Sequence, residues 1–175
     1  MATKTYRVAI LGCRGRGTAA ARAYHAHPRC EIVGLCDLVP ELLVTLGDEL
    51  GIDARYEDLD KMIQETSPDI VAVPTGTEFH YPLCMRVVEY GVHIDVEKPI
   101  CVDLLQADSL LKKAEEKGTG LVPLSRNIPS VYLIDLIRCS PYNLPPLSRE
   151  VCHAWSAAPG HRPNPPPARP VRALR

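Results

Sequence analysis

Short apolar runs alternate with amphipathic segments along the first 124 residues of the chain. The runs are rich in Val, Ile and Leu and apolar throughout, which is typical of strands covered by helices on both faces. The segments between them have helical spacing, and several end at a glycine. We expect strands at residues 6–11, 31–36, 54–56, 69–73, 92–96 and 121–124. We expect helices at residues 15–27, 40–50, 59–65, 78–90 and 103–117.

This alternation predicts an α/β fold, a doubly wound and mostly parallel Rossmann sheet with strand order 3-2-1-4-5-6. The sixth strand contains Pro123, which has no N–H to donate. An edge position tolerates that loss, and the sixth strand of this order lies at an edge. Residues 1–125 are therefore expected to form one domain.

A glycine-rich turn, GCRGRG at residues 12–17, follows the first strand, and Asp37 closes the second strand twenty residues after Gly17. Gly12 allows a sharp turn, and Gly17 allows the helix to pack closely on the sheet. Amides at the helix start attract phosphate groups. Asp37 would accept hydrogen bonds from ribose hydroxyls and repel a 2′-phosphate. This order of elements predicts a dinucleotide site that takes NAD, with NADP less favoured.

The turn departs from the usual G-x-G-x-x-G pattern, because Arg14 stands where the second glycine belongs. Two interpretations are open. In one, Gly15 permits the close approach of the backbone while Arg14 and Arg16 reach the phosphates. In the other, Arg14 crowds the site and weakens binding. Two arginines near the phosphates also make the preference for NAD over NADP a moderate one.

Two further segments lie where the fourth and fifth strands end. The first is the loop at residues 74–77, which leads to His80, and the second is E-K-P at residues 97–99. With the glycine turn and the strand-end aspartate, the sequence resembles the Gfo/Idh/MocA oxidoreductases over roughly residues 5–120. The E-K-P segment is the specific part of this resemblance. The resemblance implies an NAD-dependent oxidoreductase of sugars or polyols, in which the Lys-Pro bond is often cis.

The resemblance also implies roles for individual residues. Lys98 would be the catalytic residue, residues 74–76 would line the ribose and nicotinamide, and His80 would lie near the cofactor. Glu97 would contact a ribose or orient its loop. The alternatives are an exposed Lys98 paired with Glu97 or Asp95, and a buried His80 bonded to backbone groups. The residues expected to bind the cofactor are Gly12, Cys13, Arg14, Gly15, Arg16, Gly17, Asp37, Pro74, Thr75, Gly76, His80, Glu97 and Lys98.

The composition changes after about residue 121. Residues 121–175 contain eleven of the seventeen prolines and seven arginines, but no lysine. Because proline interrupts helices and central strands, we expect residues 126–175 to be an irregular or disordered tail without a second domain. An arginine-bearing interaction segment and the product of a shifted reading frame are open alternatives. Family members carry a second, substrate-binding domain, so the chain alone is expected to be inactive. The alternatives are a non-catalytic NAD-binding or interaction module and a truncated or frameshifted fragment.

The overall charge and the spacing of the cysteines limit the classes of partner and metal site that we expect. The formal net charge is −1, which suggests neither nucleic acid nor membrane binding. No stretch has the length of a transmembrane helix, and the N-terminus lacks a signal-peptide pattern. The seven cysteines have no zinc-like spacing, so we expect reduced structural thiols in the cytoplasm and no metal site.

Overall fold

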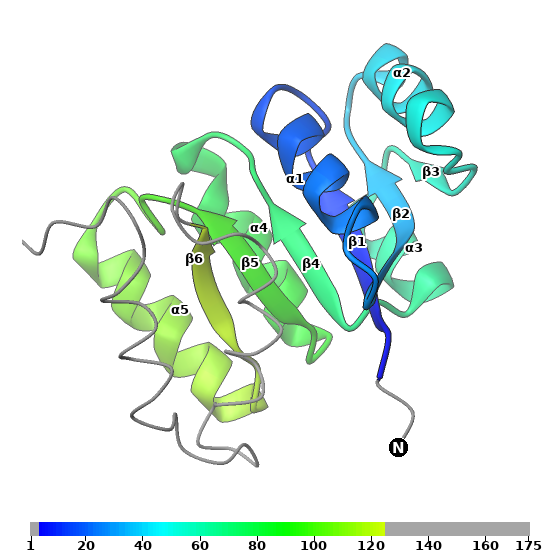
Figure 1. The fold of residues 1–175 in the computed structure, drawn as a ribbon. Coiled ribbons are helices and arrows are strands. Elements are labelled where there is room, and N and C mark those ends of the chain that lie inside the picture. The colour runs from blue at the N-terminus through cyan, green and yellow to red at the C-terminus, as the bar shows by residue number, and fades with distance from the viewer. Residues whose placement is uncertain (1–3, 125–175) are drawn as a thin grey trace, which may run out of the picture.

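The computed structural model describes residues 4–124, and the expected tail at residues 126–175 lies outside them (Figure 1). The described strands are β1 (Tyr6–Leu11), β2 (Cys30–Cys36), β3 (Arg55–Tyr56), β4 (Ile70–Val73), β5 (His93–Glu97) and β6 (Leu121–Leu124). The described helices are α1 (Arg16–His25), α2 (Pro40–Leu50), α3 (Leu59–Thr66), α4 (Thr77–Glu89) and α5 (Leu104–Lys117). Each element lies within about two residues of its predicted position.

The strands form one parallel sheet in the order β3-β2-β1-β4-β5-β6, as predicted. All the strands point the same way, so their carboxyl ends meet at one edge. The order reverses between β1 and β4, the adjacent strands that open the two halves of the sheet. In open α/β sheets, ligands bind outside the carboxyl ends of the strands at this reversal. The glycine turn and the loop after β4 both lie there.

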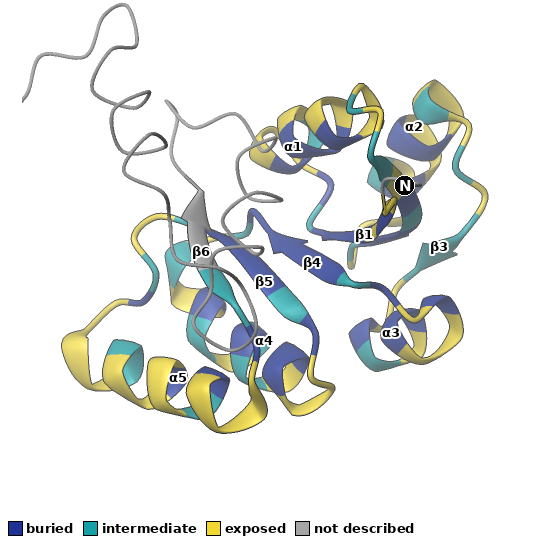
Figure 2. Ribbon diagram, turned by 60° about the horizontal axis from the view of Figure 1, so that its bottom comes forward, coloured by how far each residue is buried: buried dark blue, intermediate teal, exposed yellow. Residues whose placement is uncertain are grey.

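Helices cover both faces of the sheet (Figure 1). Helices α1 and α2 lie on one face, and α3, α4 and α5 lie on the other. The central strands β1 and β4 are buried between these layers, whereas the outward sides of the helices are exposed (Figure 2). This arrangement explains why β4, the sequence Ile-Val-Ala-Val, is apolar at every position.

The helix ends follow local sequence signals. Asp58 and Asp103 cap α3 and α5, and their carboxylates accept hydrogen bonds from the amides of Lys61 and Gln106 at 2.7 and 2.9 Å. Helix α2 ends at Gly51, whose φ of 68° is a left-handed conformation that glycine adopts without strain. These signals place the loops between strands and helices where the sequence predicts them.

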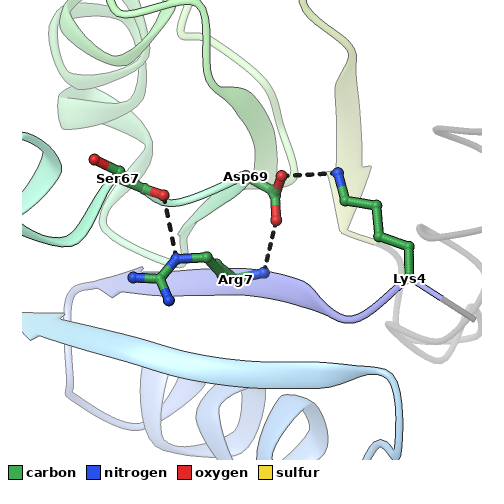
Figure 3. Close-up of polar contacts among 4 residues, drawn as sticks. All are labelled: Lys4, Arg7, Ser67 and Asp69. Atoms are coloured by element: carbon green, nitrogen blue, oxygen red, sulfur yellow. Dashed lines mark hydrogen bonds and ion pairs between the residues drawn. The ribbon is translucent and has the colours of Figure 1, made fainter. Parts of the chain in front are cut away.

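The carboxylate of Asp69 lies at the amino edge of the sheet, between Lys4 and Arg7 (Figure 3). Its carboxylate accepts hydrogen bonds from the Arg7 amide and the Lys4 ammonium, both at 2.9 Å. The Arg7 guanidinium donates to the Ser67 carbonyl at 3.4 Å. Burial raises the pKa of Asp69, but the Arg7 amide and Lys4 outweigh it and leave that pKa below its usual value. This group therefore joins β1 to the start of β4 at the edge opposite the glycine turn and the loop after β4.

Candidate functional site

The glycine turn packs tightly against its surroundings at Gly12 and Gly17. A Cβ atom on Gly17 would lie 1.8 Å from the Gly12 carbonyl oxygen, so only glycine fits there. Gly12 has a φ of 100°, and a Cβ on it would lie 3.0 Å from Cγ2 of Thr75. The turn after β1 therefore lies directly against the loop after β4. Both positions therefore require glycine, as the sequence pattern predicts.

The start of helix α1 is open. Gly15 is its N-cap residue, with a φ of 43°, and a Cβ added to it would meet nothing within 4 Å. No side chain caps the helix, and its first turn contains no acidic residue. The Gly17 amide donates to the Arg14 carbonyl at 2.8 Å, but no side chain caps the other amides of the first turn, which form the positive end of the helix dipole. A helix start of this kind attracts anionic groups such as a pyrophosphate.

Asp37 is joined to the glycine turn. One carboxylate oxygen accepts the Cys13 amide at 2.7 Å, and the other accepts the Val39 amide at 3.0 Å. Sequence reasoning assigned Asp37 to a ligand and missed this structural part. Each oxygen has a second lone pair, so the same carboxylate can hold the turn and still accept a ligand hydroxyl.

The two arginines of the turn differ in their surroundings. Arg14 is exposed and has no ion pair within residues 4–124, which favours the interpretation in which it does not block the turn. The Arg16 guanidinium instead lies 3.2 Å from a Glu97 carboxylate oxygen. This ion pair connects the turn after β1 with the loop after β5. Contact of either arginine with a phosphate stays a prediction.

The E-K-P segment lies at the carboxyl end of β5. The second carboxylate oxygen of Glu97 accepts the Lys98 amide at 3.1 Å, and its roles at a ribose or in orienting the loop stay predictions. Lys98 is exposed, and within the described residues its ammonium forms no ion pair with Glu97 or Asp95. The Lys98–Pro99 peptide bond is cis. The ammonium is therefore available to a ligand at this edge.

The loop after β4 contributes a buried hydroxyl, and the first turn of α4 contributes a buried imidazole. Oγ1 of Thr75 is buried without a hydrogen-bond partner among the described residues. An orphaned buried hydroxyl is unusual and fits a missing ligand. His80 is only 1% exposed, and its ring nitrogens face the carbonyl oxygens of Thr75 and Pro99 at 3.0 and 2.9 Å. Pro74 is buried, and Gly76 is the N-cap residue of α4.

The sequence did not predict a buried hydrogen-bonded pair that joins α1 to β5. The Tyr24 hydroxyl of α1 donates to a carboxylate oxygen of Asp95 on β5 at 2.5 Å, and both side chains are almost completely buried. The pKa of Asp95 is raised to about 7, mainly by burial; the hydrogen bond from Tyr24 lowers it, and nearby Glu97 adds a smaller rise. The signal was an aspartate within an apolar strand.

The cysteines near the site are not nucleophiles. Burial, followed by Asp37 and Cys36, raises the pKa of Cys13 to about 12, and burial raises that of Cys84 to about the same value. Both thiols therefore stay protonated at neutral pH. All five cysteines among the described residues are free.

A family profile matches the sequence of the residues that form this site. The profile of the Gfo/Idh/MocA oxidoreductase family, described as an NAD-binding Rossmann fold, matches residues 6–123. The chain belongs to this family. The matched residues begin with β1 and extend into β6, so they include every loop of the candidate site. Family membership confirms the resemblance drawn from the E-K-P segment and the glycine turn.

The sequence identity between this chain and individual family members is low. The chain is 28% identical over 119 residues to D-apiose dehydrogenase of Paraburkholderia graminis, covering 68% of this chain and 32% of that protein. It is 29% identical over 126 residues to D-glucoside 3-dehydrogenase of Escherichia coli, covering 69% and 35%. The chain thus spans about a third of the length of these curated relatives.

A solved structure with the same fold is GenD2 from gentamicin A biosynthesis, in complex with NAD. The TM-score is 0.65 at 26% identity, and the match covers 69% of this chain and 34% of GenD2.

No helix among residues 4–124 is long and apolar enough to cross a membrane. In the same range, no three His, Cys, Asp or Glu side chains are grouped so that they would hold a metal ion.

Proposed function

We propose that this chain binds NAD, in preference to NADP, across the carboxyl edge of its sheet. The open, uncapped start of α1 beside Asp37 carries this proposal. The amides of α1 would hold the pyrophosphate, and Asp37 would accept the hydroxyls of the adenosine ribose. The unpaired Thr75 hydroxyl would receive a partner from the other half of the dinucleotide.

The negative charge of Asp37 supports the choice between the two dinucleotides. A 2′-phosphate would replace a hydroxyl donor with two negative charges near the carboxylate. Arg14 and Arg16 belong to the glycine turn that Asp37 contacts, but Arg16 is paired with Glu97, which leaves Arg14 without an ion pair among residues 4–124. The carboxylate would outweigh this single exposed arginine at the ribose, so that NAD is favoured.

We further propose that the chain serves in the oxidation of a sugar or polyol hydroxyl, with Lys98 as the catalytic residue. NAD, when bound, accepts the hydride that leaves the carbon of the substrate. Lys98 in its neutral form, with the lone pair of the amine free, would accept a hydrogen bond from the substrate hydroxyl and take up its proton, which returns the side chain to an ammonium. Glu97 holds the Lys98 amide and so orients this part of the loop. The substrate class is supported by the names of the two dehydrogenase relatives.

Titration calorimetry with the full chain tests the binding proposal. We expect NAD to bind at least about tenfold more tightly than NADP. At a hundredfold excess over its Kd, NAD should stabilise the fold by about 2.7 kcal/mol. The absence of both heat and thermal stabilisation at millimolar NAD would refute the proposal.

A Lys98→Met variant tests the catalytic part separately. It should bind NAD within about threefold of the wild-type affinity, because Lys98 is assigned to the substrate. A matched control is Lys112→Met, since Lys112 is an exposed lysine of α5. NADH formation from a panel of aldoses and polyols should be lost only in the Lys98 variant. NAD binding without any NADH formation by the wild type would refute activity of this chain and leave the binding proposal intact.

A further inference from the structure

His80 joins two loops at the carboxyl edge of the sheet. It lies in the first turn of α4, and one ring nitrogen faces the carbonyl oxygen of Thr75, just before that helix, at 3.0 Å. The other ring nitrogen faces the carbonyl oxygen of Pro99, in the loop after β5, at 2.9 Å. One imidazole therefore contacts the backbone of both loops.

These contacts begin where the sheet ends. The register between β4 and β5 runs as far as Val73 opposite Val96. Both carbonyls contacted by the ring lie beyond this last pair, where strand hydrogen bonds no longer fix the spacing. The imidazole thus connects the loops that follow β4 and β5, beyond the last paired residues of these two strands.

The two loops carry the groups assigned above to the nicotinamide half of the dinucleotide and to the substrate. One loop carries the unpaired Thr75 hydroxyl, and the other carries Lys98 next to Pro99. Thr75 also lies against the glycine turn, because a Cβ on Gly12 would be 3.0 Å from its Cγ2. A shift of His80 would therefore move the loops after β4 and β5, and through Thr75 it would also affect the glycine turn.

We propose that His80 is a positioning residue that sets the distance between the Thr75 hydroxyl and Lys98, and does not itself contact the cofactor. The ring is 1% exposed and both of its nitrogens face backbone carbonyls, so it has little capacity for a ligand. This inference rests on the proposed function, because it assumes that the dinucleotide lies between these loops.

The test compares two ligands that differ only beyond the second ribose. ADP-ribose has the adenosine, pyrophosphate and terminal ribose of NAD but lacks nicotinamide. The dissociation constants of the full chain for NAD and ADP-ribose are measured for the wild type, His80→Ala and His80→Gln. The matched control is His93→Gln, because His93 begins β5 at the opposite edge and its ring accepts the Gly120 amide at 2.8 Å.

We expect His80→Ala to raise the ratio of the NAD constant to the ADP-ribose constant about tenfold, as for the loss of one or two hydrogen bonds. His80→Gln should restore part of the ratio, because its amide reaches one of the carbonyls. The fluorescence of bound NADH should also change in His80→Ala, since it reports the surroundings of the nicotinamide. His93→Gln should change neither quantity.

An unchanged ratio in both His80 variants would overturn the inference, even where both ligands bind more weakly. Such a uniform loss is what a purely structural histidine would cause. If His80→Ala does not fold, the ratio in His80→Gln decides the matter. Failure of wild type to bind either ligand would instead refute the proposed function.

Discussion

Replacing Asp37 with alanine removes two hydrogen bonds, one from the glycine turn and one from the start of α2. The carboxylate accepts the Cys13 amide at 2.7 Å and the Val39 amide at 3.0 Å. Cys13 is 2% exposed, so water cannot easily replace the lost acceptor. A hydrogen bond to a charged group contributes about 1.5–3 kcal/mol, and we expect a loss of about 2–3 kcal/mol in the free energy of unfolding. The melting temperature should fall by about 10 °C.

The same substitution should weaken NAD binding. Loss of the charged acceptor for a ribose hydroxyl corresponds to about a tenfold to hundredfold increase in Kd. NADP binding should weaken less, because the repulsion of its 2′-phosphate disappears as well. Asp37→Asn keeps one oxygen as an acceptor, so it should cost less stability while still reducing the preference for NAD. Thermal unfolding and titration calorimetry with both dinucleotides measure these effects.

Asp69→Ala is the matched control. Asp69 also accepts a buried-strand amide, that of Arg7, but at the amino edge of the sheet (Figure 3). Its removal should lower stability by a similar amount and leave the affinity for NAD unchanged. If Asp37→Ala resembles this control in both measurements, Asp37 is structural alone, and the assignment of the ribose site is wrong.

Three further substitutions test separate parts of the structure. Gly17→Ala should destabilise the fold by more than about 3 kcal/mol in chemical unfolding, because its Cβ would lie 1.8 Å from the Gly12 carbonyl; a stable variant would contradict this packing. Arg16→Gln should change stability by less than about 1 kcal/mol, since its ion pair with Glu97 is partly exposed; a loss of NAD affinity that shrinks in high salt would show a phosphate contact instead. The raised pKa of Asp95, about 7, means that wild type loses stability as the pH rises from about 4 to about 7, because the folded state retains a proton that the unfolded state releases. Asp95→Asn should abolish this dependence, and parallel pH profiles of unfolding for the two proteins would refute it.

Much of the fold followed from the sequence because the relevant signals are local. The apolar runs mark strands buried on both faces, and glycines such as Gly51 mark helix ends. Alternation of strands and helices then restricts the topology, because parallel strands need crossover connections. The glycine turn and Asp37 were recognisable for the same reason, since their spacing belongs to a single strand-helix-strand unit.

The tertiary structure alone decided which side chains meet. Tyr24 and Asp95 form a buried pair although they are 71 positions apart, and Arg16 pairs with Glu97 across two loops. The ring nitrogens of His80 face two backbone carbonyls, an arrangement that its place in the sequence left open. Periodicity reports which face of an element is buried. Partners across separate elements depend on strand order, helix placement and rotamers, which no short segment contains.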